Sequence, residues 1–157
     1  MRVLLALGAV AVAVALVAIP VASATRPDVC LLTNAEVGKV LGGKIAGRTG
    51  GGSEKRGYSC TWTGPTLHGF FAVTRTAGID FHRQTRAEFD REKARAAQNG
   101  AFIIGLKGIG VEAYENQGPV DEVDAWQRGY SLAVYTQEVV SPLESEKTLA
   151  KLALSRL

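Results

Sequence analysis

The two cysteines are the residues of this sequence with the clearest chemistry. Cys30 and Cys60 are the only cysteines in the chain, and in an oxidising compartment an even number of cysteines usually pairs. A bridge between them would close a loop of about 31 residues and stabilise the fold by roughly 3–4 kcal/mol. Two buried free thiols, or half of a metal site, are the alternatives. Zinc takes four ligands and no histidine lies near either cysteine, so the pair favours a disulfide.

Histidines and carboxylates give weaker signals. Neither His68 nor His82 has the nucleophile motif and the orienting carboxylate that a hydrolase triad needs. Five acidic residues on a predicted hairpin offer a carboxylate pair for glycoside hydrolysis or oxygen ligands for calcium, without the spacing of a calcium-binding loop. They are Glu112, Glu115, Asp121, Glu122 and Asp124. The sequence therefore predicts no catalytic, metal or cofactor site.

Aromatic side chains are better candidates for a binding role, because aromatics on an antiparallel sheet can line a concave surface. We expect Trp62 to belong to the core. Trp126 shares its predicted strand face with charged residues, which indicates exposure, and we take it as the first possible partner contact. Tyr114 and Tyr135 are the other two, and Tyr130 is a further member of this aromatic set.

The N-terminus has the pattern of a secretory signal peptide. Arg2 is followed by an unbroken apolar run over 3–19, then by Pro20 and by the small-residue cleavage site at 22–24. The competing interpretation is an uncleaved membrane anchor, but a helix over this run reaches only about 25 Å against a hydrocarbon core of about 30 Å. We expect a signal peptide over 1–24 and a single extracytoplasmic domain over 25–157.

The composition limits the possible partners. The formal net charge is +3, and scattered positive charge does not make the concentrated basic stripe of a nucleic-acid-binding protein. The expected partner is an unknown protein or small ligand of the cell envelope. We expect membrane contact only through an uncleaved leader, and no lipid anchor, because the residues before Cys30 form no lipid-attachment box.

The first half of the domain reads as one helix and a hairpin. Thr33 and Glu36 form a capping box for a helix over 34–41, which Gly42 and Gly43 end. A short strand is expected over 44–46 and a glycine-rich surface loop over 48–57, which lacks the spacing of a phosphate-binding loop. Alternation predicts strands over 58–63 and 67–76, joined by a turn at Gly64-Pro65.

The second half reads as two helices around three strands. A charged helix is expected over 81–99 and a terminal helix from a second capping box at Ser141–Glu144 to Leu157. Strands are expected over 111–115, 122–128 and 130–139, after a glycine-punctuated apolar stretch over 102–106, with a tight turn at Arg128-Gly129. This order predicts an α+β fold with a mainly antiparallel sheet of about five strands, helices packed on one face and one disulfide.

The motif that surrounds the first cysteine resembles a known family. The segment over 28–37 (D-V-C-L-L-T-N-A-E-V), the later Cys60-Thr61-Trp62 and the stretch Gly108-Ile109-Gly110 are similar to the actinobacterial secreted and lipid-anchored proteins called domain of unknown function 3558. The resemblance implies an envelope location and paired cysteines, and brings no reaction, ligand or catalytic residue.

Three functions are open at this point. The first is a non-catalytic extracytoplasmic binding or interaction module that presents one sheet face or the glycine-rich segment to a partner. The second is a small secreted hydrolase that uses the acidic residues of the second hairpin, with Glu112 and Asp124 as its first candidates. The third is a structural component of the envelope.

Overall fold

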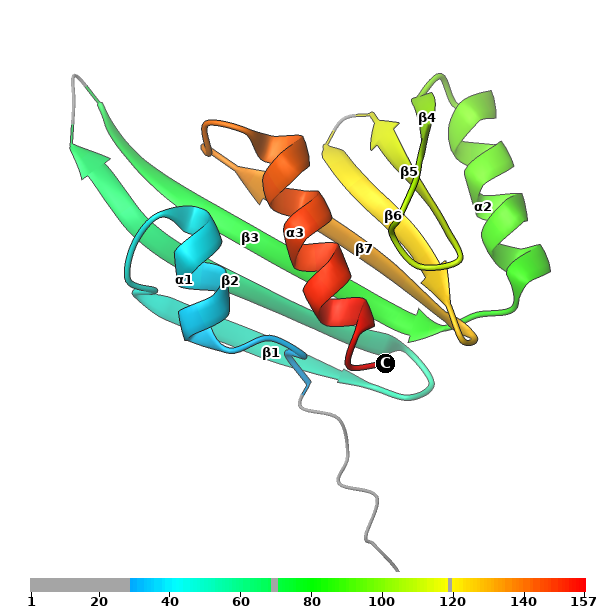
Figure 1. The fold of residues 1–157 in the computed structure, drawn as a ribbon, viewed down its shortest axis with the longest axis horizontal. Coiled ribbons are helices and arrows are strands. Elements are labelled where there is room, and N and C mark those ends of the chain that lie inside the picture. The colour runs from blue at the N-terminus through cyan, green and yellow to red at the C-terminus, as the bar shows by residue number, and fades with distance from the viewer. Residues whose placement is uncertain (1–28, 69–70, 119) are drawn as a thin grey trace, which may run out of the picture.

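In the computed structural model, which describes residues 29–68, 71–118 and 120–157, seven strands form one antiparallel sheet in the order β1-β2-β3-β7-β6-β5-β4 (Figure 1). The strands are β1 Gly47–Ser53, β2 Gly57–His68, β3 Ala72–Arg83, β4 Phe102–Leu106, β5 Glu112–Gln117, β6 Asp121–Gln127 and β7 Tyr130–Gln137. The helices are α1 Asn34–Leu41, α2 Arg86–Gln98 and α3 Pro142–Leu154. The α+β class and the antiparallel sheet are confirmed, with seven strands in place of about five.

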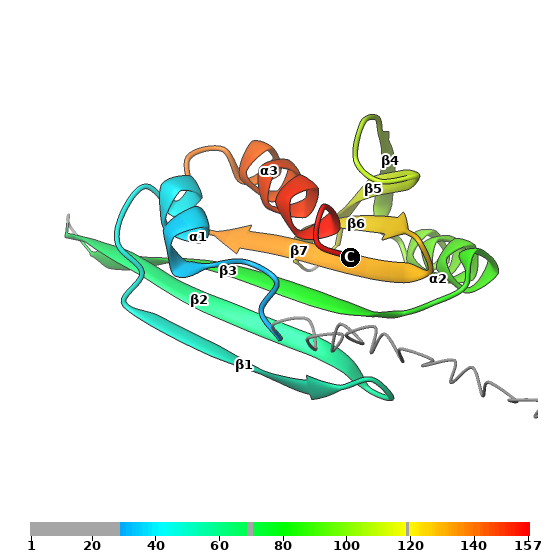
Figure 2. The same cartoon turned by 60° about the horizontal axis from the view of Figure 1, so that its bottom comes forward.

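The helices divide between the two faces of the sheet. α1 and α3 lie side by side on one face (Figure 2), where α1, α3 and the strands contribute buried residues to one core. α2 packs on the other face, since its Phe89 contacts Tyr114 of β5 at a ring distance of 5.4 Å while the neighbouring Ala113 belongs to the core. Successive residues of a strand point to opposite faces. The expectation of all helices on one face is therefore wrong for α2.

The core accounts for the alternation of apolar and polar residues from which the central strands were predicted. Trp62, Ile79, Leu132 and Val134 are fully buried, and each alternates with more polar residues along its strand, as expected for a sheet with one core face. The prediction that Trp62 belongs to the core is confirmed. On the helix side, Leu149, Ala150, Ala153 and Leu154 of α3 close this core.

Capping boxes start two of the helices. Thr33 and Glu36 cap α1 as predicted, and Thr85 and Glu88 cap α2 in the same reciprocal way. The helix expected over 81–99 was placed too early, because β3 continues to Arg83. At α3 Pro142 occupies the first turn, but Ser141 makes no side-chain cap, so the capping box predicted at Ser141–Glu144 is wrong. The Glu144 side chain pairs with Lys147 at 2.6 Å.

The long β2–β3 hairpin corrects two further expectations. No turn occurs at Gly64-Pro65, where the β2–β3 register shifts between Thr63 and Thr66 and the strand continues to His68. Proline is tolerated there because β1 stops pairing at Thr63, which leaves that part of β2 with a free edge. His68 and His82 consequently lie at opposite ends of the hairpin.

The glycine-rich segment is an edge strand, contrary to the predicted loop. β1 pairs with β2 along its whole length, from Gly47 opposite Thr63 to Ser53 opposite Gly57. The strand expected over 44–46 therefore begins later, at Gly47. The disulfide explains why one position of this strand, Gly50, has no side chain. A Cβ on Gly50 would lie 2.7 Å from the Cys30 sulfur and 3.2 Å from the Cys60 sulfur, whereas a Cβ on Gly51 would have nothing within 4 Å.

This difference between adjacent glycines makes a matched test. We expect Gly50→Ala to lower the free energy of unfolding by about 1–3 kcal/mol, because the added methyl group overpacks against the two buried sulfurs. Gly51→Ala should change it by less than about 0.5 kcal/mol. Urea denaturation of both variants measures the difference. Equal stability of the two would contradict the close packing of β1 on the disulfide.

The predicted disulfide is confirmed. Cys30 and Cys60 are bonded with their Cα atoms 5.1 Å apart, which ties the segment before α1 to β2. The signal peptide predicted over 1–24 lies outside the described residues, as do 25–28. Among the residues that are described, no helix is long and apolar enough to cross a membrane.

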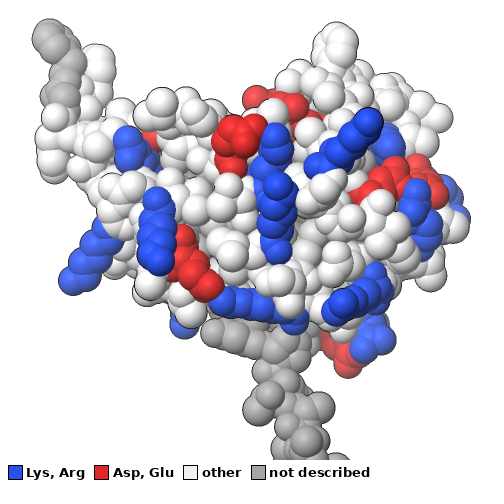
Figure 3. Space-filling view, viewed as in Figure 1, with Lys and Arg blue, Asp and Glu red and all other residues white. Residues whose placement is uncertain are grey.

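Charged side chains are mixed over the surface. Figure 3 shows Lys and Arg side chains scattered over the face that carries α1 and α3, with Asp and Glu side chains between them.

Candidate functional site

A pocket of about 390 Å³ opens at one end of the sheet, where the β1–β2 turn, the end of β3 and the start of β7 meet. Its walls combine aromatic, charged and backbone groups. They are formed by Val29, Gly52, Ser53, Glu54, Tyr58, Phe81, His82, Arg83 and Tyr130. Pockets with apolar walls and a few convergent polar groups are the usual form of small-ligand sites.

The wall of the pocket toward the core is aromatic. Tyr58 and Phe81 stack with ring centroids 5.1 Å apart, because Tyr58 on β2 is the direct partner of Phe81 on β3. Phe81 is buried and belongs to the core, whereas Tyr58 is half-buried. The pair therefore forms a rigid apolar surface that ends the core.

The opposite wall depends on a tight turn. Arg128 and Gly129 both have positive φ angles, of 50° and 81°, as in a two-residue hairpin turn that matches the twist of its strands. The turn predicted at this position is confirmed. It starts β7 at Tyr130, directly opposite Arg83 of β3, and the Arg83 guanidinium lies 5.4 Å from the centre of the Tyr130 ring.

The rim of the pocket carries both charges. Arg83 pairs with Glu54 at 3.3 Å, and the two side chains are 66% and 74% exposed. An ion pair at this exposure contributes little to stability, so the pair can exchange for a ligand group at low cost. The rim thus offers a replaceable cation beside a π surface, which suits an anionic group attached to an apolar or aromatic body.

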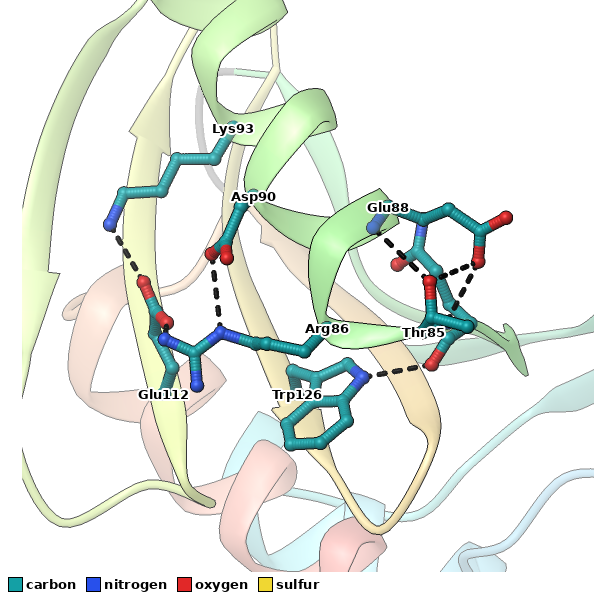
Figure 4. Close-up of polar contacts among 8 residues, drawn as sticks. Thr85, Arg86, Glu88, Asp90, Lys93, Glu112 and Trp126 are labelled. Carbon is teal, nitrogen blue, oxygen red and sulfur yellow. Dashed lines mark hydrogen bonds and ion pairs between the residues drawn. The ribbon is translucent and has the colours of Figure 1, made fainter.

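A second polar cluster lies under α2 (Figure 4). Arg86 and Lys93 both pair with Glu112 of β5, the latter at 2.9 Å, and Arg86 also bonds Asp90 at 3.2 Å. The Arg86 guanidinium lies 5.7 Å from the Trp126 ring centre. Glu112 is thereby used to hold α2 on the sheet.

Trp126 lies on the polar face of β6, as the alternation predicted, but most of it is covered. Its indole N–H donates to the Gln84 carbonyl oxygen at 2.9 Å, and Arg86 stacks on its ring as Figure 4 shows. Since a tryptophan that uses its donor internally and carries a side chain on its ring is anchoring structure, Trp126 presents limited surface to a partner.

The other two proposed contacts differ in exposure. Tyr114 is only 3% exposed and is enclosed by Phe89 and Lys93 of α2. Tyr135 is half-buried on the open part of the same face, and its ring occupies the position where a Cβ on Gly78 would stand. Of these two, only Tyr135 offers a solvent-facing surface.

The acidic residues of the second hairpin separate between the two faces. Glu122 and Asp124 lie on the α2 face with Tyr114, which is the cross-strand partner of Asp124, whereas Glu115 points to the core face, where it is buried. Burial, and then the nearby Glu122 charge, raise the pKa of Asp124 to about 7. Burial also raises the pKa of Glu122. This shift makes Asp124 the one strongly perturbed carboxyl of the hairpin.

Metal coordination finds no support in the part of the chain that the structure describes. No group of three or more His, Cys, Asp and Glu side chains there is placed to hold a metal ion.

Sequence reasoning missed the pocket, although the strands that it predicted over 58–63 and 130–139 begin at two of the pocket residues, Tyr58 and Tyr130. Arg83 was assigned to a helix and Glu54 to a loop. Arg83 meets Glu54 because β2 pairs with β3, and it meets Tyr130 because β3 pairs with the distant β7. The alternation of Ile79, Phe81 and Arg83 is the signal that would have placed Arg83 at a strand end. No protein-family model, curated protein sequence or solved structure matches this chain.

Proposed function

We propose that this protein is a secreted, non-catalytic binding module of the cell envelope, which holds a small ligand in the pocket between the β1–β2 turn, β3 and β7. The observation that carries the proposal is the combination of an aromatic wall, Tyr58 on Phe81, with the replaceable Arg83–Glu54 pair at the rim. The ligand class that fits is a molecule with an aromatic or apolar body and one anionic group.

The envelope location rests on the leader pattern and on the cysteines. An apolar leader with a small-residue cleavage site directs export, and a disulfide persists in oxidising compartments. The resemblance of the cysteine motifs to the actinobacterial family called domain of unknown function 3558 supports the same location.

A small secreted hydrolase is the second candidate, and one observation favours it. A carboxyl with a pKa of about 7, such as Asp124, is suited to proton transfer near neutral pH. Glu112 is less suited, because two cations of α2 neutralise it. Turnover of an ester, peptide or polysaccharide by the purified protein, lost in Asp124→Asn, would establish this candidate in place of the first.

The binding proposal is tested with two related probes, indole-3-acetate and indole, which share a ring and differ in the anionic group. We expect indole-3-acetate to bind with chemical-shift changes at residues of the pocket, and Arg83→Gln to weaken it about fivefold, since one exposed charge-assisted contact is worth about 1 kcal/mol. Indole should bind more weakly to the unaltered protein and be unaffected by Arg83→Gln.

Two further variants sharpen the result. Glu54→Gln removes the competitor of the ligand anion and should tighten the binding of indole-3-acetate. Arg91→Gln, which changes an exposed arginine of α2 outside the pocket, is the matched control and should have no effect. No binding of either probe, or equal weakening by the Arg83 and Arg91 substitutions, would overturn the assignment of the pocket.

A further inference from the structure

The outer edge of β4 is open. β4 is the last strand of the sheet, and among the described residues no backbone group of Phe102–Leu106 bonds to anything beyond β5. Its sequence, F-I-I-G-L, contains no charged residue and no proline. Charged residues and proline are two of the features that keep unpaired edge strands from associating, and this edge carries neither.

The side chains of this strand are also exposed. Phe102 is 74% and Ile104 is 46% exposed, and both point to the same side of β4 by strand alternation. The opposite sheet edge, β1, is different, because it is built of glycines with Arg48, Thr49 and Ser53. The apolar edge of β4 therefore contrasts with the glycine-rich and polar edge of β1.

We propose that β4 pairs antiparallel with β4 of a second copy of this chain, about a two-fold axis that passes through Ile104. This interface is isologous, so each contact occurs twice and the assembly closes as a dimer. In this register Ile104 faces its own copy, Phe102 faces Leu106, and Ile103 faces Gly105. The two sheets then continue into one.

The size of the side chains fits this register. A Cβ on Gly105 would have nothing within 4 Å, so the surface beside Gly105 is empty on the α2 side of the strand. Ile103 of the second copy would lie against this space. On the other side of the strand, the exposed Phe102 of one copy would cover the half-buried Leu106 of the other. In this register each large side chain meets a smaller or more buried one.

Charge complementarity supports the same register. Lys107, the first residue after β4, is exposed, and in this pairing it faces Ala101 of the second copy. Ala101 follows the C-terminus of α2, which ends at Gln98 with Asn99 as its cap. The C-terminal end of a helix carries a partial negative charge, so each Lys107 would lie beside the favourable end of the other copy's α2.

The strand is short, which sets the expected strength. An interface built on five residues from each copy belongs to the small, reversible class. Sedimentation velocity of the purified protein over about 10 µM to about 1 mM should therefore show a monomer that converts to a dimer with rising concentration. A monomer throughout this range overturns the proposal.

Two exposed substitutions test the surface. Ile104→Lys places two like charges at the two-fold axis and should weaken dimerisation at least about tenfold. Val140→Lys is the matched control, since Val140 is 91% exposed and lies between β7 and α3, and it should leave dimerisation unchanged. A dimer that survives Ile104→Lys uses another surface and contradicts the proposal.

Cysteine pairs test the register. Ile104→Cys should form a disulfide-linked dimer under mild oxidation, because the two copies of this position meet at the axis. Phe102→Cys should not, because its two copies lie four residues apart along the strands, about 13 Å. The native cysteines are already bonded to each other. If Phe102→Cys forms the linked dimer and Ile104→Cys does not, or if neither variant forms it, this pairing is overturned.

Discussion

Replacing both cysteines, in the variant Cys30→Ala/Cys60→Ala, is expected to lower the free energy of unfolding by about 3–4 kcal/mol. The bond joins residues 30 positions apart, and its loss frees this loop in the unfolded chain. Both side chains are buried, at 4% and 1% exposure, so the shortened side chains also leave a small void beside β1. Urea denaturation of the variant and of the unaltered protein measures the difference.

Reduction provides the control for this experiment. The unaltered protein in excess dithiothreitol should lose a similar amount of stability, and the alanine variant should not respond to the reductant. A loss below about 1 kcal/mol would mean that the bond adds little to contacts that already hold this segment. Such contacts exist, because the Arg156 guanidinium binds both the Leu31 carbonyl oxygen and the Glu36 carboxylate.

Raising the pH from 5 to 8 is expected to destabilise the protein, and Asp124 is the main cause. Burial raises the pKa of Asp124 from 3.8 to about 7 in the folded state. Between these values the folded protein keeps a proton that the unfolded chain releases, so stability falls as the pH rises, by roughly 2–3 kcal/mol between pH 5 and 8. Burial also raises the pKa of Glu122 and Glu146, which contribute in the same direction.

Below pH 5 the stability is expected to fall as the pH is lowered, and the cause lies in the helix caps. Hydrogen bonds from Thr33 and Thr85 lower the pKa of Glu36 and Glu88. The stability that these carboxylates contribute is present above the usual glutamate pKa of about 4.5 and is lost below it. The fall attributed to Asp124 is therefore to be measured above pH 5, by urea denaturation at pH 5, 6.5 and 8.

Asp124→Asn identifies the group responsible. An amide keeps the shape of the side chain without the charge, so this variant should be more stable than the unaltered protein at pH 8 and should lose most of the pH dependence above pH 5. Asp121→Asn is the matched control, since Asp121 is exposed at the start of the same strand. Equal pH dependence in the unaltered protein and in Asp124→Asn would contradict the assignment.

Local chemistry determined several features that the sequence alone predicted. The two cysteines required no knowledge of the fold, because a single pair has only one internal connectivity. The cap of α1 and the turn at Arg128-Gly129 could also be predicted from the sequence, because each depends on residues within four positions of one another. The alternation of Trp62 with polar neighbours likewise marked a strand with one core face.

Only the tertiary structure decided the edges of the sheet and the candidate site. β1 is a strand because β2 lies beside it, and its run of glycines shows no alternation of apolar and polar residues from which a strand could be predicted. β4 is too short to show such an alternation. α2 covers the second face because Phe89 meets Tyr114, which the charged pattern of the helix did not reveal. The pocket forms where Arg83 meets Tyr130, two residues that only the β3–β7 pairing brings together. Contacts between distant segments depend on how the whole chain buries its apolar surface, and a local pattern carries no record of them.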